Sequence, residues 1–139
     1  MGTRDSDLDR ITRRVRGRDA VTLASDAARE FGNAQWLAGE ELARLCIVIE
    51  ELVANLYDHG GLAEHDEVEV TLSSEADGIG VVLIDSGVPF DPWEAPRPVE
   101  MPDRGGGAGI GIVRAWAQLV DYRVTDQGNR LELLLPLHW

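Results

Sequence analysis

The sequence predicts an α/β fold, a two-layer sandwich in which about three helices cover one mixed, mainly antiparallel sheet. Three observations support this prediction: two helical patterns come first, two hydrophobic alternating segments follow, and a further helix and a hairpin close the chain. The chain has 139 residues, of which 44% are hydrophobic and 27% charged, so it fits a single core of ordinary size. We expect residues 1–18 to form an N-terminal extension with an edge strand and residues 19–139 to form one domain.

The first half of the chain supplies a strand and two helices. Residues 11–15 are expected to form the short edge strand. Apolar residues then recur at helical spacing after Asp19, which is a plausible N-cap, and Gly32 is the expected stop. A longer helix is expected from about residue 38 to 58, where leucine and isoleucine alternate steps of three and four. The glycines of segment 59–61 suit the left-handed C-cap that ends such a helix.

The second half contains strands, a long loop and one helix. The loop, 89–107, has no periodicity and holds five of the six prolines. A loop of this length in a compact domain is usually functional or disordered. The other expected elements are strands at 68–72 and 79–84, a helix at 110–120, and strands at 122–125 and 130–135.

Composition limits the environment and the partners. The net charge of -12 argues against direct binding of nucleic acid. No segment approaches the ~18–20 apolar residues of a membrane helix, and no apolar run follows the N-terminal arginines, so we expect a cytoplasmic protein that does not engage a membrane. The single cysteine, Cys46, agrees with a reducing compartment. All thirteen basic residues are arginine, which excludes mechanisms that need a phosphate-binding lysine.

A glutamate and an asparagine lie one turn apart in the long helix. Glu51 and Asn55 are four residues apart and therefore share one helical face beside the apolar stripe. Asparagine is a poor mid-helix residue because its amide competes for backbone hydrogen bonds. Its oxygen suits a Mg²⁺ ion that takes other ligands from phosphates, and the carboxylate could accept a proton from an attacking hydroxyl. The alternative is two solvated glutamates, Glu50 and Glu51, beside a tolerated asparagine.

An aspartate and a glycine follow the second of the two middle strands. Asp85 lies at the end of a buried strand and therefore at the edge of the core. There its carboxylate could accept a hydrogen bond from an adenine amino group, and Gly87 would let the ring approach the backbone. The alternative is a strand end with ordinary turn residues.

A glycine-rich segment precedes the third expected helix, with five glycines between Gly105 and Gly111. Successive backbone N–H groups with a helix N-terminus behind them make an anion site for phosphates. The segment is neither a Walker loop nor a dinucleotide fingerprint, and a flexible linker is the alternative. His59 could touch a nucleotide, but the helix dipole also favours histidine at a helix C-terminus, and we prefer that structural role.

In this order and spacing, the three motifs resemble the GHKL superfamily, the ATP-binding domain shared by DNA gyrase, histidine kinases and bacterial anti-sigma-factor kinases. The resemblance is closest to the bacterial anti-sigma-factor serine/threonine kinase-like ATP-binding regulators. It covers roughly residues 19–136. The segments that carry it are 51–60, 85–92, 106–114 and 128–133.

The resemblance implies that ATP lies between the helices and a mobile lid. Glu51 would be the catalytic base and Asn55 the Mg²⁺ ligand. Asp85 would bind the adenine amine, and Gly87 would line the base pocket. Pro89 departs from the pattern, because many relatives have a second glycine there. The glycines implied to wrap the phosphates are Gly107, Gly109 and Gly111.

The function implied by this resemblance is phosphorylation of a serine or threonine on a STAS anti-anti-sigma partner by a Mg-ATP-binding regulator. A sigma factor is a second candidate partner, and a homodimer is a candidate assembly. The alternative is a catalytically weak, ATP-dependent binding module that sequesters a partner without phosphotransfer, which Pro89 and the proline-rich lid favour. The catalytic half of a histidine kinase is less favoured, because we expect no helical dimerisation region with a phosphoacceptor histidine.

Overall fold

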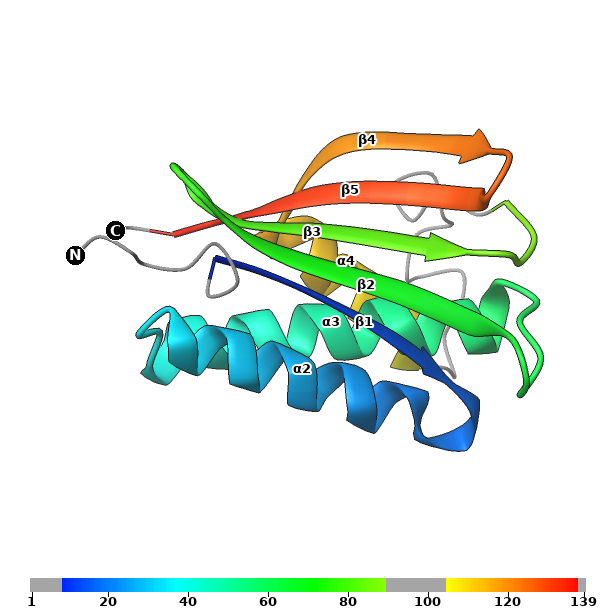
Figure 1. Ribbon diagram of the computed structural model, residues 1–139, viewed down its shortest axis with the longest axis horizontal. Coiled ribbons are helices and arrows are strands. Elements are labelled where there is room, and N and C mark those ends of the chain that lie inside the picture. Colours follow the sequence, from blue (N-terminus) through cyan, green and yellow to red (C-terminus); the bar gives the residue numbers. More distant parts are fainter. Residues whose placement is uncertain (1–8, 90–104, 138–139) are drawn as a thin grey trace.

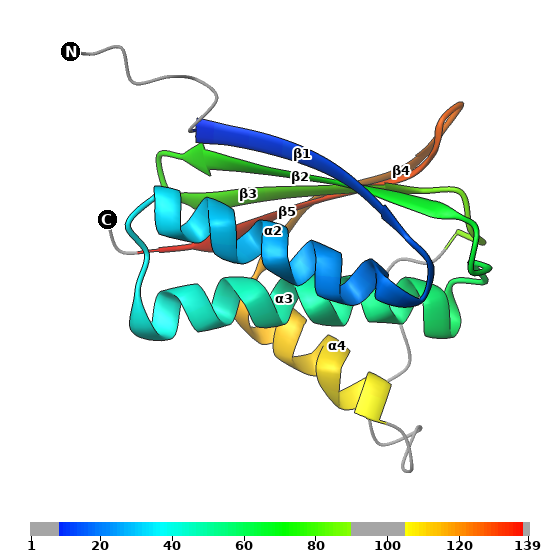
Figure 2. The same ribbon diagram turned by 60° about the horizontal axis from the view of Figure 1, so that its bottom comes forward.

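The computed structural model describes residues 9–89 and 105–137, with side chains described throughout these ranges except at 105–109. Two layers are present: a five-stranded sheet and three helices that cover one of its faces (Figures 1 and 2). The strands are β1 (Arg10–Arg16), β2 (Glu67–Glu75), β3 (Gly78–Asp85), β4 (Gln118–Thr125) and β5 (Gly128–Pro136). The helices are α2 (Ala20–Ala34), α3 (Gly39–His59) and α4 (Gly105–Trp116), and a 3-10 turn, η1 (Gly17–Asp19), precedes α2.

The sheet has the order β1-β2-β3-β5-β4, and every neighbouring pair is antiparallel. The predicted two-layer α/β sandwich is confirmed, and β1 lies at an edge as expected. The prediction of a mixed sheet is wrong for the described residues, because no parallel pair occurs among them. Short turns connect β2 to β3 and β4 to β5, and such turns can join only antiparallel strands.

The glycine predicted to stop the first helix has a different role. Helix α2 passes through Gly32 and ends at Ala34. A Cβ at position 32 would lie 2.5 Å from the Cδ1 of Leu42 on α3, so glycine permits close packing of the two helices. Trp36 takes the left-handed conformation after the helix end, with a φ of 65°. Asp19 immediately precedes α2 but makes no side-chain capping hydrogen bond.

The boundary between α4 and β4 also differs from the prediction. The helix begins at Gly105 and ends at Trp116, whereas the sequence pattern predicted a helix over 110–120. Residues from Gln118 onward instead pair with β5, where Gln118 lies opposite Leu134. Pairing with a central strand satisfies the backbone groups of this apolar segment as well as a helix would, and a short apolar run cannot distinguish the two.

The core lies between the helices and the inner face of the sheet. The apolar stripe predicted for the long helix is buried in α3 except for Leu42, which is half-buried. Each fully buried leucine or isoleucine contributes about 1.5–3 kcal/mol of hydrophobic stabilisation. Trp116 packs at the rim of this core, and the Arg44 guanidinium lies 5.2 Å from the centre of its ring, which joins the end of α4 to α3. Within the described residues, no helix is both long and apolar enough to span a membrane.

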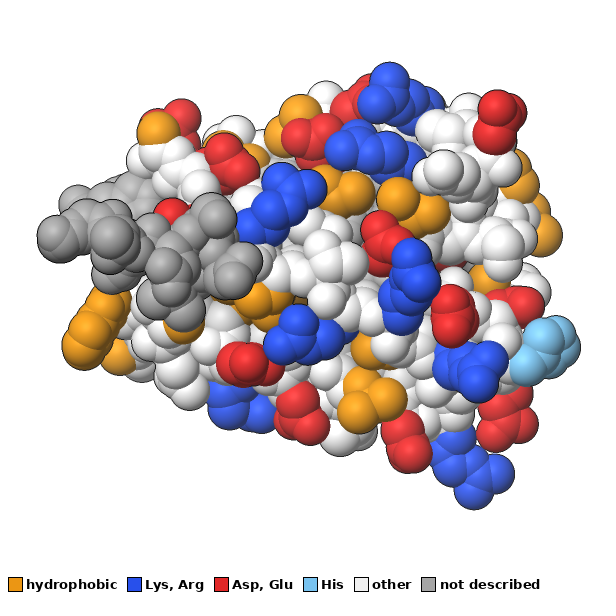
Figure 3. Space-filling model, viewed as in Figure 1, with side chains coloured by type: hydrophobic (Ala, Val, Ile, Leu, Met, Phe, Trp, Pro, Cys, Tyr) orange, Lys and Arg blue, Asp and Glu red, His pale blue; other side chains and the backbone are white. Residues whose placement is uncertain are grey.

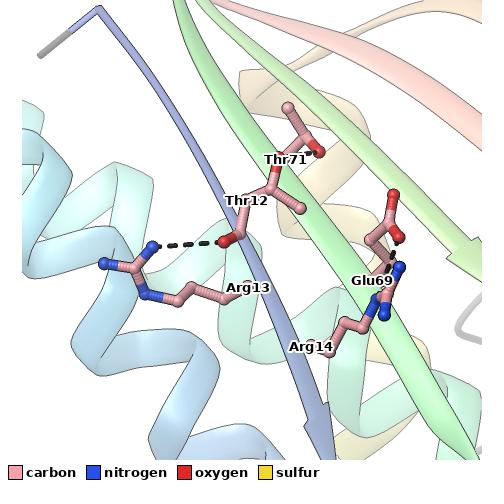
Figure 4. A network of polar contacts seen from close by, with 5 residues as sticks. All are labelled: Thr12, Arg13, Arg14, Glu69 and Thr71. Carbon is pink, nitrogen blue, oxygen red and sulfur yellow. Dashed lines mark hydrogen bonds and ion pairs between the residues drawn. The ribbon is translucent and has the colours of Figure 1, made fainter. Parts of the chain in front are cut away.

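The described helices leave the opposite face of the sheet uncovered, and polar contacts between strands occupy it (Figures 1 and 4). The Thr12 and Thr71 hydroxyls lie 2.9 Å apart between β1 and β2, and the Nε of Arg14 donates to Glu69 at 3.3 Å. Arg13 alternates to the other side of β1 and reaches Glu30 of α2 at 3.1 Å. We call this uncovered side the open face. Figure 3 shows that it carries charged side chains of both signs with apolar side chains between them.

Candidate functional site

Asp85, the last residue of β3, lies in a buried corner with two hydrogen-bond donors. Its side chain is buried, and its Oδ1 accepts from the backbone N–H of Gly87 at 2.8 Å and from the Nδ2 of Asn129 at 3.1 Å. The same Nδ2 also donates to the carbonyl oxygen of Gly87 at 2.9 Å. Both contacts to the carboxylate use Oδ1, and no hydrogen bond to Oδ2 occurs within the described residues, so Oδ2 can accept from a ligand. The corner thus holds an oriented acceptor at the edge of the core.

Gly87 is required by the backbone that surrounds it. A Cβ at this position would overlap the carbonyl oxygen of Gly60, the residue that follows α3, and would lie 3.0 Å from Leu62. The backbone N–H of Val88 donates to that same Gly60 carbonyl at 2.8 Å. The glycine therefore brings the segment after β3 against the end of α3. The sequence analysis expected Gly87 to admit a ligand ring, and the structure adds this packing role.

Asn55 faces the corner from α3. Its side chain is 6% exposed, and it lines a small cavity together with Asp85, Leu83 and Tyr122. No hydrogen bond joins its side-chain amide to another residue in the described part of the chain. Among the described residues, the Nε of Arg44 is the only fully buried side-chain atom without a partner, so the Asn55 amide keeps some access to solvent. Water or a ligand in the cavity can supply the hydrogen bonds that a nearly buried amide requires. This geometry also explains how an asparagine is accommodated in the middle of a long helix.

Glu51 precedes Asn55 by one turn on the same helix. Burial raises the pKa of its carboxyl group, and the negative charges of Glu50 and Asp58 raise it further. A carboxylate with a raised pKa is a stronger proton acceptor once ionised. Glu50 has a different environment, because it accepts a 2.6 Å hydrogen bond from the Ser25 hydroxyl of α2. The structure therefore assigns Glu50 to the contact between helices, whereas Glu51 lies one turn before Asn55 and does not itself line the cavity.

The cavity is small and mostly apolar. Its volume is about 10 Å³, which is close to that of a single water probe. A purine ring would have to displace its neighbours to enter between α3 and the sheet. Its lining is formed by Leu52, Asn55, Leu56, Leu83, Asp85, Tyr122 and Leu131. An apolar wall with two convergent polar groups is the usual composition of a small-molecule site.

The remaining predicted site residues lie further out. His59 is the last residue of α3 and is exposed, which suits a favourable interaction with the helix dipole. The glycine-rich segment is helical and not a loop, since Gly107, Gly109 and Gly111 all fall within α4. Gly107 lies in the first turn, where backbone N–H groups have no intrahelical acceptor, whereas Gly109 and Gly111 lie beyond it. Most of the expected lid, 90–104, lies outside the described residues.

Asn129 was not predicted as a site residue. It is 4% exposed, and it connects the Asp85 carboxylate to the Gly87 carbonyl. It directly follows Gly128, where a Cβ would overlap the backbone carbonyl of Asp85. A polar residue directly after a turn glycine is common in hairpins, so the sequence pattern gave no reason to select it. Only the register of β3 and β5, which places Asn129 opposite Asp85, identifies it as part of the site.

Comparisons with known proteins agree with the fold. The family of histidine kinase-like ATPase domains matches residues 17–135, so the chain belongs to this family within the GHKL superfamily. Among solved structures, the chain is similar to the histidine kinase domain of the Erythrobacter litoralis EL346 blue-light activated histidine kinase. The TM-score is 0.51 at 16% identity, and the similarity covers 85% of this chain and 59% of that one. The chain thus spans less than two thirds of its structural neighbour, and no curated protein matches it.

Proposed function

We propose that the chain binds Mg-ATP and phosphorylates a serine or threonine of a STAS-domain anti-anti-sigma partner, and that it thereby regulates a sigma factor. Membership in the histidine kinase-like ATPase family supports ATP binding and kinase-like character. The single observation that carries the phosphotransfer proposal is Glu51, a carboxylate with a raised pKa one turn from the partner-free Asn55 amide. Phosphoryl transfer depends mainly on positioning and charge stabilisation, and one base beside one metal ligand can serve it.

The adenine end of the proposed site is Asp85. Its free Oδ2 would accept from the exocyclic amine of the base, while Asn129 and the Gly87 N–H keep Oδ1 occupied. Leu52, Leu83 and Leu131 would cover the ring. A site that offers a fixed acceptor rejects a base with a carbonyl at that position, because two acceptors would face each other. The proposed site therefore prefers ATP to GTP.

The residues present fit a magnesium ion that is shared with a nucleotide. Among the described residues, no three histidine, cysteine or carboxylate side chains cluster as a metal site. Asn55 would contribute its Oδ1, and the other ligands would be phosphate oxygens and water, which is the usual arrangement for Mg²⁺. When bound, the ion would neutralise charge on the phosphates. Glu51 would accept the proton of the partner's hydroxyl group.

The test combines purified chain, labelled ATP, Mg²⁺ and a purified STAS protein. Transfer of label to a serine or threonine is expected for the wild type, and Glu51→Gln should reduce it by about 10²-fold or more, the typical contribution of a general base. Glu50→Gln is the matched control, because it keeps an acceptor for Ser25 and should retain transfer. If the two variants lose activity equally, Glu51 is not the base.

The same experiment separates the alternative function. A binding module without transfer would bind the STAS protein in a Mg-ATP-dependent manner and leave it unlabelled. Transfer of label to a histidine would instead assign a histidine kinase activity. Absence of any stabilisation by ATP or ADP would contradict both the kinase and the ATP-dependent binding module. A nucleotide at about 100 times its dissociation constant should stabilise the folded state by ~2.7 kcal/mol.

A further inference from the structure

A hollow on the open face, away from the candidate site, combines an apolar floor with an acidic rim. Its volume is about 310 Å³. The floor is formed by Val82, Val120 and Leu134, and the rim carries Glu75, Asp77 and Glu132. We call these six residues the acidic groove. None of them lines the cavity between Asn55 and Asp85.

A β-bulge lies beside the apolar floor. The pairing of β4 with β5 shifts register between Leu119 and Asp121, so Val120 is the extra residue of the bulge. Its side chain is 55% exposed, on a strand at the edge of the sheet. Bulges recur beside functional sites. Here an accessible apolar side chain lies next to the carboxylates of the rim.

The rim has one sign of charge. Three carboxylates line the acidic groove, and no arginine or histidine is among its described lining residues. Two of the carboxylates are held by neighbours: Glu132 pairs with Arg130 at 3.1 Å, and Glu75 accepts from the Ser73 hydroxyl at 2.6 Å. Asp77 lies exposed in the turn between β2 and β3. Although Arg130 offsets the charge of Glu132, the rim keeps a net negative charge, which favours a cation over an anion.

A second hollow on the same face shows that this charge pattern is not general. It is larger, about 510 Å³, and lies at the end of the sheet near Asp85. There Arg14, Arg16 and His65 lie among four carboxylates, and Arg14 pairs with Glu69 at 3.3 Å. This hollow therefore offers charges of both signs, whereas the charged residues among the described lining of the acidic groove are all carboxylates. Of the two, the acidic groove is the one whose chemistry defines a partner.

We propose that the acidic groove docks a segment of a protein partner that carries an arginine or lysine next to a leucine, isoleucine or valine. The apolar side chain would cover Val82, Val120 and Leu134, while the cation would meet the carboxylates of the rim. A volume of about 310 Å³ is at the lower end of known binding pockets, which suits a few side chains. The net charge of -12 would speed the encounter with a basic partner and oppose self-association.

The test uses a fluorescent peptide in which arginine and leucine alternate, with anisotropy as the measurement and nitrogen-15 NMR shifts of the labelled chain to locate the contact. The expected shifts lie at Gly80, Val82 and Val120. Val120→Ser should weaken binding by about fivefold through lost apolar burial, and Asp77→Asn by about threefold through a lost charge. A higher salt concentration should also weaken binding of the peptide to the wild type, because salt screens the attraction between charges.

The matched controls lie on the same strand and the next turn. Val124→Ser removes another exposed valine of β4, 62% exposed and outside the groove, and Asp126→Asn neutralises an exposed carboxylate between β4 and β5. Both control variants should bind the peptide as tightly as the wild type does. A melting temperature equal to that of the wild type, measured for each variant, would exclude misfolding as a cause of weaker binding. Asn55→Ala should also retain peptide binding, so a failed nucleotide site would not affect this test.

Four outcomes would overturn the proposal. The first is no binding of the arginine-leucine peptide up to millimolar concentration. The second is equal weakening by Val120→Ser and Val124→Ser. The third is equal affinity for an arginine peptide without leucine, which would indicate charge attraction alone. The fourth is a dimer in sedimentation velocity that Val120→Ser dissociates, which would make a second copy of the chain the occupant.

Discussion

Asp85 and Asn55 line the same cavity, yet their side chains differ in the hydrogen-bond partners that the protein supplies. The aspartate is held by two donors at 2.8 and 3.1 Å and is enclosed by glycines that admit no Cβ. The asparagine is at least as buried, at 6% exposed against 7% for the aspartate, but its side chain has no hydrogen-bond partner in the described part of the chain. The hydrogen bonds of the Asp85 corner are supplied by the protein, whereas the Asn55 amide is open to water or to a ligand. Substitutions on the two sides should therefore separate stability from nucleotide binding.

The largest effect is expected at the corner, from Gly87→Ala. The added methyl group would overlap the Gly60 carbonyl, and a backbone atom cannot move aside as a flexible side chain can. We expect the free energy of unfolding to fall by about 3 kcal/mol, at the upper end of overpacking penalties. Denaturant titration would measure it. Gly39→Ala is the control: nothing lies within 4 Å of its Cβ, so only its positive φ should cost about 1 kcal/mol. Equal losses would mean that the corner is not close-packed.

Asn129→Ala should have the next largest effect. It removes the donor that joins the Asp85 carboxylate to the Gly87 carbonyl and leaves both acceptors with fewer partners. The expected loss of stability is about 2 kcal/mol, the penalty for unsatisfied buried polar groups. Affinity for ATP should fall as well, because Asp85 would no longer be oriented. Calorimetry of unfolding with and without nucleotide measures both effects. Loss of affinity with full stability would show that Asn129 contacts the nucleotide and does not support the corner.

On the α3 side, Asn55→Ala should change the stability of the free protein by less than about 0.5 kcal/mol, because no hydrogen bond is lost and alanine is the better helix former. The thermal shift produced by Mg-ATP should nevertheless disappear. This result would sharpen the comparison, since one variant would lose the ligand without losing the fold. If nucleotide-free Asn55→Ala were destabilised as strongly as Asn129→Ala, the expectation would be contradicted and Asn55 would have a structural role.

The smallest expected effect is the change in melting temperature caused by Glu51→Gln. The folded-state pKa of Glu51 lies above its unfolded value, so the folded protein binds this proton more tightly. The stability that the protonated carboxyl provides is therefore present at low pH and is lost as the pH rises through the raised pKa. The variant should melt slightly higher than the wild type at pH 7 and at the same temperature near pH 4. Glu41→Gln on the same helix serves as the control, and a lower melting temperature for Glu51→Gln at pH 7 would contradict the expectation.

Much of the fold and part of the candidate site followed from local pattern. The stripe of α3 and the alternation of β2 and β3 predicted their elements, because side-chain periodicity reports directly which face is buried. Glu51, Asn55, Asp85 and Gly87 were selected because their residue types are unusual or informative at those positions. The end of α4 and the start of β4 were predicted wrongly. An apolar run there fits either structure, and only pairing with β5 decides between them.

The sequence by itself determined the order of the elements, the two-layer class and the residue types that a phosphate ester and a metal would require. Tertiary structure decided which of these residues meet. It placed Asn129 against Asp85 through the β3–β5 register, and it used Gly32 for helix packing and Gly87 for contact with the end of α3. It also left the Asn55 side-chain amide without a hydrogen-bond partner among the residues that the structure describes. Contacts between residues that belong to different elements are set by register and packing, and local sequence patterns contain no information about either.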